Sequence, residues 1–194
     1  MKDVLDRMFV ATQGYLEKPD PKVLAKIQDY ERITDNMQKE VTVFLCQVMQ
    51  RPMSEHQSKQ SQSMIKIVDE FESIADYLDR IAGYKAKFKD EILTGENKAE
   101  YFEFMNKVWE FVNLCSAAVY DIEAHNLEVT FKKCEELRIL ADDMRDKHLK
   151  NITAGKYDAL TALTYSDMVV ALRKIRAHAM NVSTAVDMYH ESEV

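Results

Sequence analysis

Glycine and proline are scarce in this chain of 194 residues, which has 4 glycines and 3 prolines. Together they fall well below the roughly 12% of residues that they make up in average proteins. Because tight turns between short strands depend on these two residues, the sequence argues against a fold of many short strands. It also contains no Gly-rich loop of the kind that cradles a phosphate group.

Cysteine is scarce as well, and Cys46, Cys115 and Cys134 are isolated from one another. Their odd number and the absence of a CxxC motif argue against a disulfide framework and against a zinc knuckle. Each lies in an apolar helical run, so we expect core packing in a reducing compartment.

Long apolar runs are absent too, since no stretch approaches the 18 or so residues that a membrane-spanning helix needs. The start, MKDVLDRMFV, carries acidic residues and has no sustained apolar core, so it does not resemble a signal peptide. We therefore expect a cytoplasmic protein, or the cytoplasmic part of something larger.

The chain also lacks an excess of positive charge: it has 26 Lys and Arg residues and 33 Asp and Glu residues, which give a net charge of −7. Binding to a nucleic-acid backbone requires clustered Lys and Arg, so nucleic acid is not expected as a partner. An acidic surface is better suited to cations or to a basic protein face.

What the sequence does contain is helical periodicity, which predicts six helices. They cover residues 1–17, 21–50, 54–93 and 98–125, then a stretch that ends near residue 155, and finally 158–190. The end signals that we expect are Asp20 with Pro21, Ser54 with Gln57, Asn97 with Glu100, and Gly155 as a C-cap.

Apolar residues at alternating steps of four and three form a seam on the long helices, as expected of helices packed lengthwise in a bundle. His148 lies on the seam of the fifth helix, where we expect a hydrogen-bonded core histidine. The seam of the second helix is Val23, Ile27, Tyr30, Thr34, Met37, Val41, Phe44 and Val48, and the aromatic core of the fourth is Tyr101, Phe102, Phe104, Trp109, Phe111 and Tyr120.

The order of helix lengths, short–long–long and then long–long–long, predicts an all-α fold of two three-helix bundles. We place them at residues 1–94 and 95–194, within one domain overall. A shift of 107 residues superposes the seam of the second helix on that of the fifth, which is compatible with an internal repeat.

Acidic side chains follow one flank of the seam on the second and third helices. Glu31 and Asp35 are four residues apart, as are Glu72 and Asp76, so each pair shares a helical face. If the two helices are antiparallel neighbours, the pairs converge, and a cation, a basic partner or raised pKa values must relieve their repulsion. Oxygen ligands suit hard cations such as Mg, Ca, Mn and iron. A solvated acidic face with no ion is the alternative.

Two of these acidic segments resemble a known family. YERITD at residues 30–35 and DEFESIAD at 69–76 resemble the paired E/D-xxx-D motifs of PhoU-like proteins. The turn between them, QRPMSEHQ, follows that family's order of elements, and residues 172–182 of the sixth helix resemble the motif again. The subgroup that the chain resembles most is the soluble C-terminal domain of bacterial sodium/phosphate cotransporters.

The resemblance implies two three-helix bundles with carboxylate-bound metal on their surface, and a regulatory rather than enzymatic role in phosphate uptake. The implied partner is a membrane phosphate transporter or its associated regulators, which would tether this cytoplasmic chain to the inner membrane. The seam length of the second helix also leaves room for a homodimer. The implied ligands of an Fe, Mn, Zn or Mg ion are Glu31, Asp35, Glu72 and Asp76, with Asp69 and Asp79 extending the set.

The second half departs from the family's pattern. Arg138, Arg173 and Ala177 stand where carboxylates are expected, and Asp142 alone is retained. Arginine does not ligate a cation but pairs well with a carboxylate. We therefore expect a metal-free second half in which Asp142 forms salt bridges.

A metal-binding bundle with storage or redox enzymatic activity is the alternative function. A di-iron oxidase of this kind requires Glu three residues before a ligating histidine. No histidine of the chain has this spacing; the five are His56, His125, His148, His178 and His190. A plain scaffold without an ion is a third reading.

Overall fold

The computed structural model describes residues 1–88, 93, 95–121 and 126–190, and the fold within them is all-α, as predicted. Across this part of the chain there are six helices and no strand. They are α1 (Lys2–Glu17), α2 (Pro21–Met49), α3 (Glu55–Phe88), α4 (Gly95–Ala117), α5 (Leu127–Thr153) and α6 (Ala159–His190).

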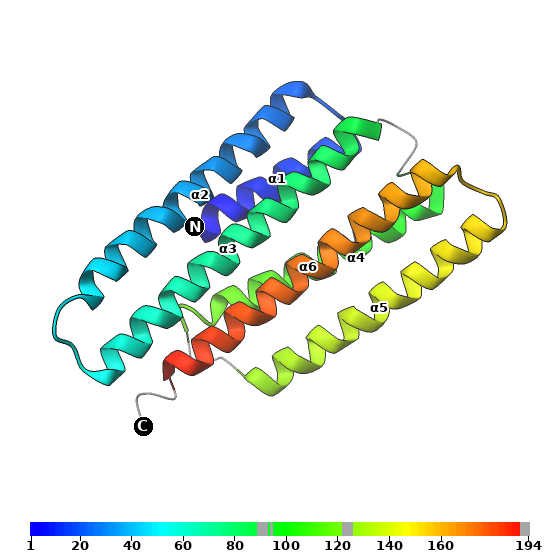
Figure 1. Cartoon of the computed structure of the whole chain (residues 1–194). Helices are drawn as coiled ribbons and strands as arrows, with labels where there is room; N and C mark the ends of the chain where they lie inside the picture. Colours follow the sequence, from blue (N-terminus) through cyan, green and yellow to red (C-terminus); the bar gives the residue numbers. More distant parts are fainter. Residues whose placement is uncertain (89–92, 94, 122–125, 191–194) are drawn as a thin grey trace.

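The helices form two three-helix bundles that lie side by side (Figure 1). Helices α1, α2 and α3 contact one another, as do α4, α5 and α6. The most extensive contact of all joins α3 to α6, so these two helices form the centre of the molecule. Helices α2 and α5 lie at opposite edges.

One continuous hydrophobic cluster fills both bundles. The ring of Phe9 from α1 stacks on Trp109 from α4 with centroids 4.2 Å apart, which joins the bundles a second time. The largest fully buried side chains come from both halves of the chain: Leu5, Met8, Leu16, Ile27, Ile74, Leu78, Ile81, Tyr101, Phe104, Met105, Met144 and Tyr165.

Most of the predicted helix ends are confirmed. The carboxylate of Asp20 accepts a hydrogen bond from the backbone N–H of Lys22 (2.8 Å) at the start of α2. Ser54 and Gln57 form the reciprocal capping box, with distances of 3.0 and 3.2 Å. Gly155 has φ +69°, the left-handed conformation that favours glycine after a helix.

The fourth helix differs from the prediction at both ends. It begins at Gly95, so Asn97 lies inside it and its amide donates to the hydroxyl of Tyr157 (2.6 Å) instead of capping with Glu100. The helix ends at Ala117, before the predicted end at 125, and residues 122–125 lie outside the described part. Tyr120 follows the helix and is 78% exposed, so it is not part of the core.

Only part of the predicted seam of α2 is buried. Ile27 and Thr34 are buried as predicted, whereas Phe44 is 62% exposed and Leu45 is buried in its place. The reason is that α1 has 16 residues and α2 has 29, so α1 runs beside only the N-terminal part of α2 (Figure 1). The rest of the outer face of α2 has no helix over it.

Candidate metal centre

The predicted carboxylates lie along the contact between α2 and α3. Glu31 and Asp35 project from α2, and Glu72 and Asp76 from α3, with Asp79 one turn further along; all five are partly buried. We call these five residues the acidic strip.

The carboxylates of the acidic strip lie close enough to one another to raise one another's pKa values. Burial raises the pKa of Glu31, and the charges of Asp79, Asp35 and Asp76 raise it further. Burial likewise raises the pKa of Glu72, with Asp76, Asp35 and Glu31 adding to the effect. The pKa of Asp79 is raised by burial and then by Asp76. Carboxylates from α2 and α3 therefore disfavour one another's ionisation.

Basic side chains at the outer edge of the acidic strip relieve part of this repulsion. Lys39 pairs with Asp35 (Nζ–Oδ2 2.7 Å), and Arg80 pairs with Asp76 (Nη2–Oδ2 2.6 Å). Each base lies four residues after its acid, the spacing at which opposite charges meet on a helix. The sequence therefore contained a signal for both pairs in the four-residue spacing of each base from its acid.

Asp69 lies apart from the acidic strip. Its side chain is exposed and accepts a hydrogen bond from the amide of Gln38 across the α2–α3 contact (2.6 Å). Its hydrogen-bonding partner is thus an uncharged amide of the neighbouring helix.

The donor chemistry of the acidic strip fits a hard cation, because every donor is a carboxylate oxygen and the set carries unrelieved negative charge. The side-chain arrangement does not complete the fit. Among the described residues, no group of three or more His, Cys, Asp or Glu side chains is arranged to hold a metal ion. Binding would require the carboxylates to turn inward and Lys39 and Arg80 to release Asp35 and Asp76.

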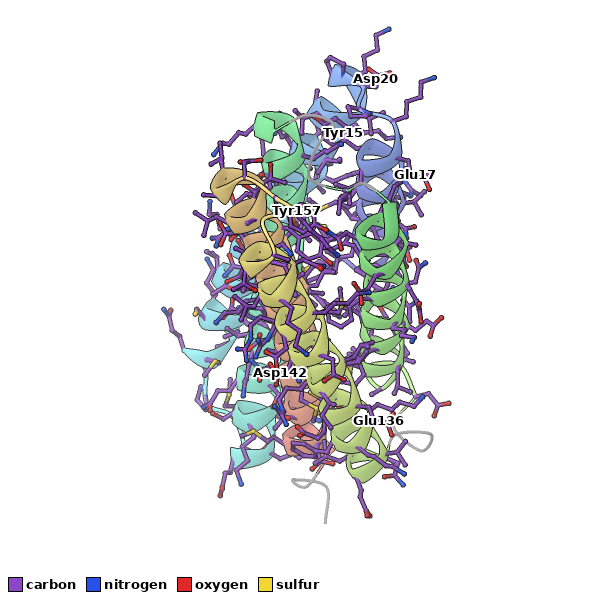
Figure 2. The ribbon with its side chains drawn as sticks, turned by 90° about the vertical axis from the view of Figure 1, so that its right-hand side faces the viewer. Tyr15, Glu17, Asp20, Glu136, Asp142 and Tyr157 are labelled. Atoms are coloured by element: carbon purple, nitrogen blue, oxygen red, sulfur yellow. The ribbon has the colours of Figure 1, made fainter. Side chains whose placement is uncertain are left out.

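The corresponding face of the second bundle carries ion pairs. Asp142 accepts a hydrogen bond from Arg138 on its own helix (Nη1–Oδ2 2.6 Å) and forms an ion pair with Arg173 of α6 (Nη1–Oδ1 3.2 Å). Figure 2 shows Asp142 on α5 where that helix runs alongside α6. Arg138 also pairs with Glu135. The salt bridges expected at this face are present, and the pair of Asp142 with Arg173 joins α5 to α6.

A polar contact between the bundles was not foreseen. His178 of α6 lies 2.7 Å from a carboxylate oxygen of Glu70 on α3, and Asn181 donates to the other oxygen (3.0 Å). The ring of Tyr77 lies beside His178, with centroids 5.6 Å apart. Glu70 and His178 are 108 residues apart in the chain, so no local spacing could have predicted the pair.

His148 behaves as predicted. It is 4% exposed, and its Nε2 lies 2.9 Å from the carbonyl oxygen of Ala162. Tyr165 packs against the ring with centroids 4.5 Å apart. Its surroundings are those of a core residue, which gives no support to a histidine-ligated redox centre.

The fold and this site define the class of the molecule as an all-α helical bundle with an acidic surface strip. Comparison with known families is more specific: the model of the PhoU domain matches residues 1–84, which comprise α1, α2 and most of α3. The matched residues contain the whole acidic strip. No curated protein and no solved structure matches the chain. None of the helices in the described residues is long and apolar enough to cross a bilayer.

Proposed function

We propose that this protein is a non-catalytic regulator of phosphate homeostasis that acts through protein contact at the cytoplasmic face of a membrane phosphate transporter. The observation that carries the proposal is the PhoU domain over residues 1–84. PhoU domains are regulatory, and the resemblance of the motifs at residues 30–35 and 69–76 points to the domain attached to sodium/phosphate cotransporters. The tether to the inner membrane would then be the transporter itself.

The partner contact is proposed to include the acidic strip. Its carboxylates raise one another's pKa values, so a basic partner face would gain free energy by neutralising them. The second bundle has ion pairs at the corresponding face, centred on Asp142, and so offers less unrelieved charge. This difference favours the first bundle as the regulatory face.

Phosphate uptake tests the proposal. In a bacterial host whose own PhoU has been removed, expression of the chain is expected to change the initial rate of radiolabelled phosphate uptake. The variant Glu31→Gln, Glu72→Gln, Asp79→Asn is expected to lose that effect at equal expression, because the partner contact needs the charge. Uptake that is the same with and without the chain would contradict the proposed role.

We also propose that Glu31, Asp35, Glu72 and Asp76 hold a divalent or trivalent cation, of which Fe, Mn, Zn and Mg are the candidates. The ion would supply positive charge that fixes the two helix faces, with Asp69 and Asp79 extending the ligand set. The support is the donor chemistry of the acidic strip and the repulsion between its carboxylates.

Elemental analysis of the purified protein tests the metal. A near-stoichiometric ion in the wild type is expected to vanish in the variant Glu31→Gln, Asp35→Asn, Glu72→Gln, Asp76→Asn. The matched control is Glu136→Gln, Asp143→Asn, which removes two exposed carboxylates of α5 and should retain the ion. A wild type that stays metal-free after loading would identify the acidic strip as a solvated or partner-facing surface without an ion.

A further inference from the structure

The turn between α5 and α6 forms a corner of the molecule that carries exposed leucines (Figure 1). Leu149 of α5 is 51% exposed, and Leu160 and Leu163 of α6 are 55% and 61% exposed. The Nε2 atom of His148 lies 2.9 Å from the carbonyl oxygen of Ala162, so Leu149 and Leu163 lie at the same level of the two helices. Leu160 lies one turn from Leu163 on the same face of α6. Three large apolar side chains thus gather at one end of this helical hairpin, and contiguous exposed apolar surface marks an interaction site.

Lysines with free charge accompany these leucines. Lys150 follows Leu149 directly, and Lys156 lies in the turn; both are exposed, and neither forms an ion pair within the described part of the chain. Lys147 lies one helical turn before Lys150 and is already paired, with Glu100 of α4 (3.4 Å). The free positive charge therefore lies beside the exposed leucines. We call five side chains the hairpin tip: Leu149, Lys150, Lys156, Leu160 and Leu163.

The charge of this hairpin is opposite in sign to that of the whole chain. Residues 147–163 contain three lysines and one acidic residue, Asp158, in a chain of net charge −7. The carboxylate of Asp158 accepts hydrogen bonds from the backbone N–H groups of Leu160 (2.9 Å) and Thr161 (3.0 Å) at the start of α6. At physiological ionic strength, charges that lie further apart than about 8 Å are largely screened. The local positive charge therefore decides which partner approaches the hairpin tip.

The opposite end of α5 has the same types of residue without this excess of positive charge. There Val129 and Phe131 are exposed, and the exposed Lys132 and Lys133 follow them. Residues 128–136, however, contain three glutamates beside these two lysines. This end of α5 is therefore an internal comparison for the hairpin tip, because it is equally apolar and has no excess of positive charge.

We propose that the hairpin tip docks on an anionic lipid surface, with its leucines among the headgroups and Lys150 and Lys156 beside lipid phosphates. Lysines suit this position because their long side chains carry the charge to the phosphates while the leucines beside them leave water. The size of the surface favours lipid over protein: a standard protein interface uses roughly 20–30 residues on each partner, whereas a fluid bilayer adapts to a small helical turn. The docking is weak and reversible, and it does not depend on the transporter contact proposed above.

Co-sedimentation of the full chain with lipid vesicles tests the proposal, in the presence of EDTA so that no divalent ion bridges the acidic strip to lipid phosphate. The wild type is expected to sediment with vesicles of phosphatidylglycerol and phosphatidylcholine in equal parts, and much less with pure phosphatidylcholine. Lys150→Gln, Lys156→Gln should lower the partition coefficient about tenfold or more and remove most of its dependence on salt. Leu149→Gln, Leu163→Gln should also lower it but keep the salt dependence, because the lysines remain.

The matched controls are Lys132→Gln, Lys133→Gln and Val129→Gln, Phe131→Gln at the opposite end of α5. Both should bind the anionic vesicles as the wild type does, and all four variants should keep the wild-type circular dichroism. A wild type that stays in the supernatant would overturn the proposal and leave the hairpin tip to an acidic protein partner. Equal losses in the control variants and the hairpin-tip variants would also overturn it. Because the vesicles contain no protein, neither result bears on the proposed regulation of a transporter.

Discussion

Replacing Leu78 with alanine is expected to destabilise both bundles together. Leu78 lies on α3 with no exposed surface, in the hydrophobic cluster that runs through both halves. Truncating a fully buried leucine costs about 2–5 kcal/mol, from lost burial and from the cavity left behind. For a chain of this size, each kcal/mol lowers the Tm by roughly 2–4 °C.

The single tryptophan reports on the second bundle and on its contact with α1. Trp109 is on α4 in the second bundle and is 7% exposed, whereas Leu78 is in the first bundle. Because α3 packs most extensively on α6, tryptophan fluorescence and far-UV circular dichroism should show the same lowered Tm. Leu163→Ala, at a leucine of α6 that is 61% exposed, is the control and should change stability by less than about 0.5 kcal/mol. A fluorescence transition that stays at its wild-type Tm in Leu78→Ala would show that the bundles unfold separately.

The sequence predicted the helices well because each signal was local. The capping boxes and seams depend on residues three or four positions apart, and the seam of α5 is buried at Leu137, Met144 and His148 as expected. These patterns identify one face of one helix. They contain no information on how many neighbours that helix will have.

The errors concern what lies next to a helix. Phe44 has the spacing of a core residue, yet it is exposed because α2 lies at the edge and α1 is too short to cover it. Asn97 has the spacing of a cap, yet its amide bonds Tyr157, which is 60 residues away. Both outcomes depend on which helix packs where, and this is set by long-range contacts.

Local spacing predicted only part of the acidic strip. The pairing of Glu31 with Asp35, and of Glu72 with Asp76, follows from four-residue spacing, and the packing of α2 on α3 brings the pairs together. Lys39 and Arg80 could also have been predicted from their spacing to Asp35 and Asp76. Side-chain rotation, which decides whether the oxygens meet around one ion, is not encoded in spacing.

Neutralising the inner carboxylates of the acidic strip is expected to stabilise the protein at neutral pH. The variant is Glu31→Gln, Glu72→Gln, Asp79→Asn, which leaves the ion pairs of Asp35 and Asp76 intact. It relieves like-charge contact within the Glu31–Asp35 and Glu72–Asp76 pairs, worth roughly 0.2–0.5 kcal/mol for each pair. Asp69→Asn is the control, because Asp69 is exposed and accepts a hydrogen bond from the uncharged amide of Gln38.

The stability advantage of this variant over the wild type should decrease as the pH falls. The pKa values of Glu31, Glu72 and Asp79 are raised in the folded protein, so ionisation of these groups opposes folding. At pH values above these raised pKa values, the free energy of unfolding of the wild type is lowered by the whole of this repulsion. As the pH falls through them, the folded state takes up protons first and the wild type gains stability relative to the variant, until the unfolded carboxyls also protonate near pH 4. Urea unfolding of both proteins from pH 7 to pH 4 should therefore show the variant's advantage shrinking; an advantage that is constant with pH would contradict the assigned cause.

A bound cation would make the wild type more stable than the variant at neutral pH. The stability of the two proteins therefore distinguishes an acidic strip that holds a metal ion from one that does not. An ion that binds the folded state alone stabilises it by an amount that grows with its free concentration. Adding Mn²⁺ at pH 7 should then raise the Tm of the wild type above that of the variant, and lowering the pH should remove the gain because protons compete for the same oxygens. If Mn²⁺ leaves both Tm values unchanged while the variant stays the more stable protein, the acidic strip does not bind Mn²⁺ and the repulsion between α2 and α3 is not relieved by that ion.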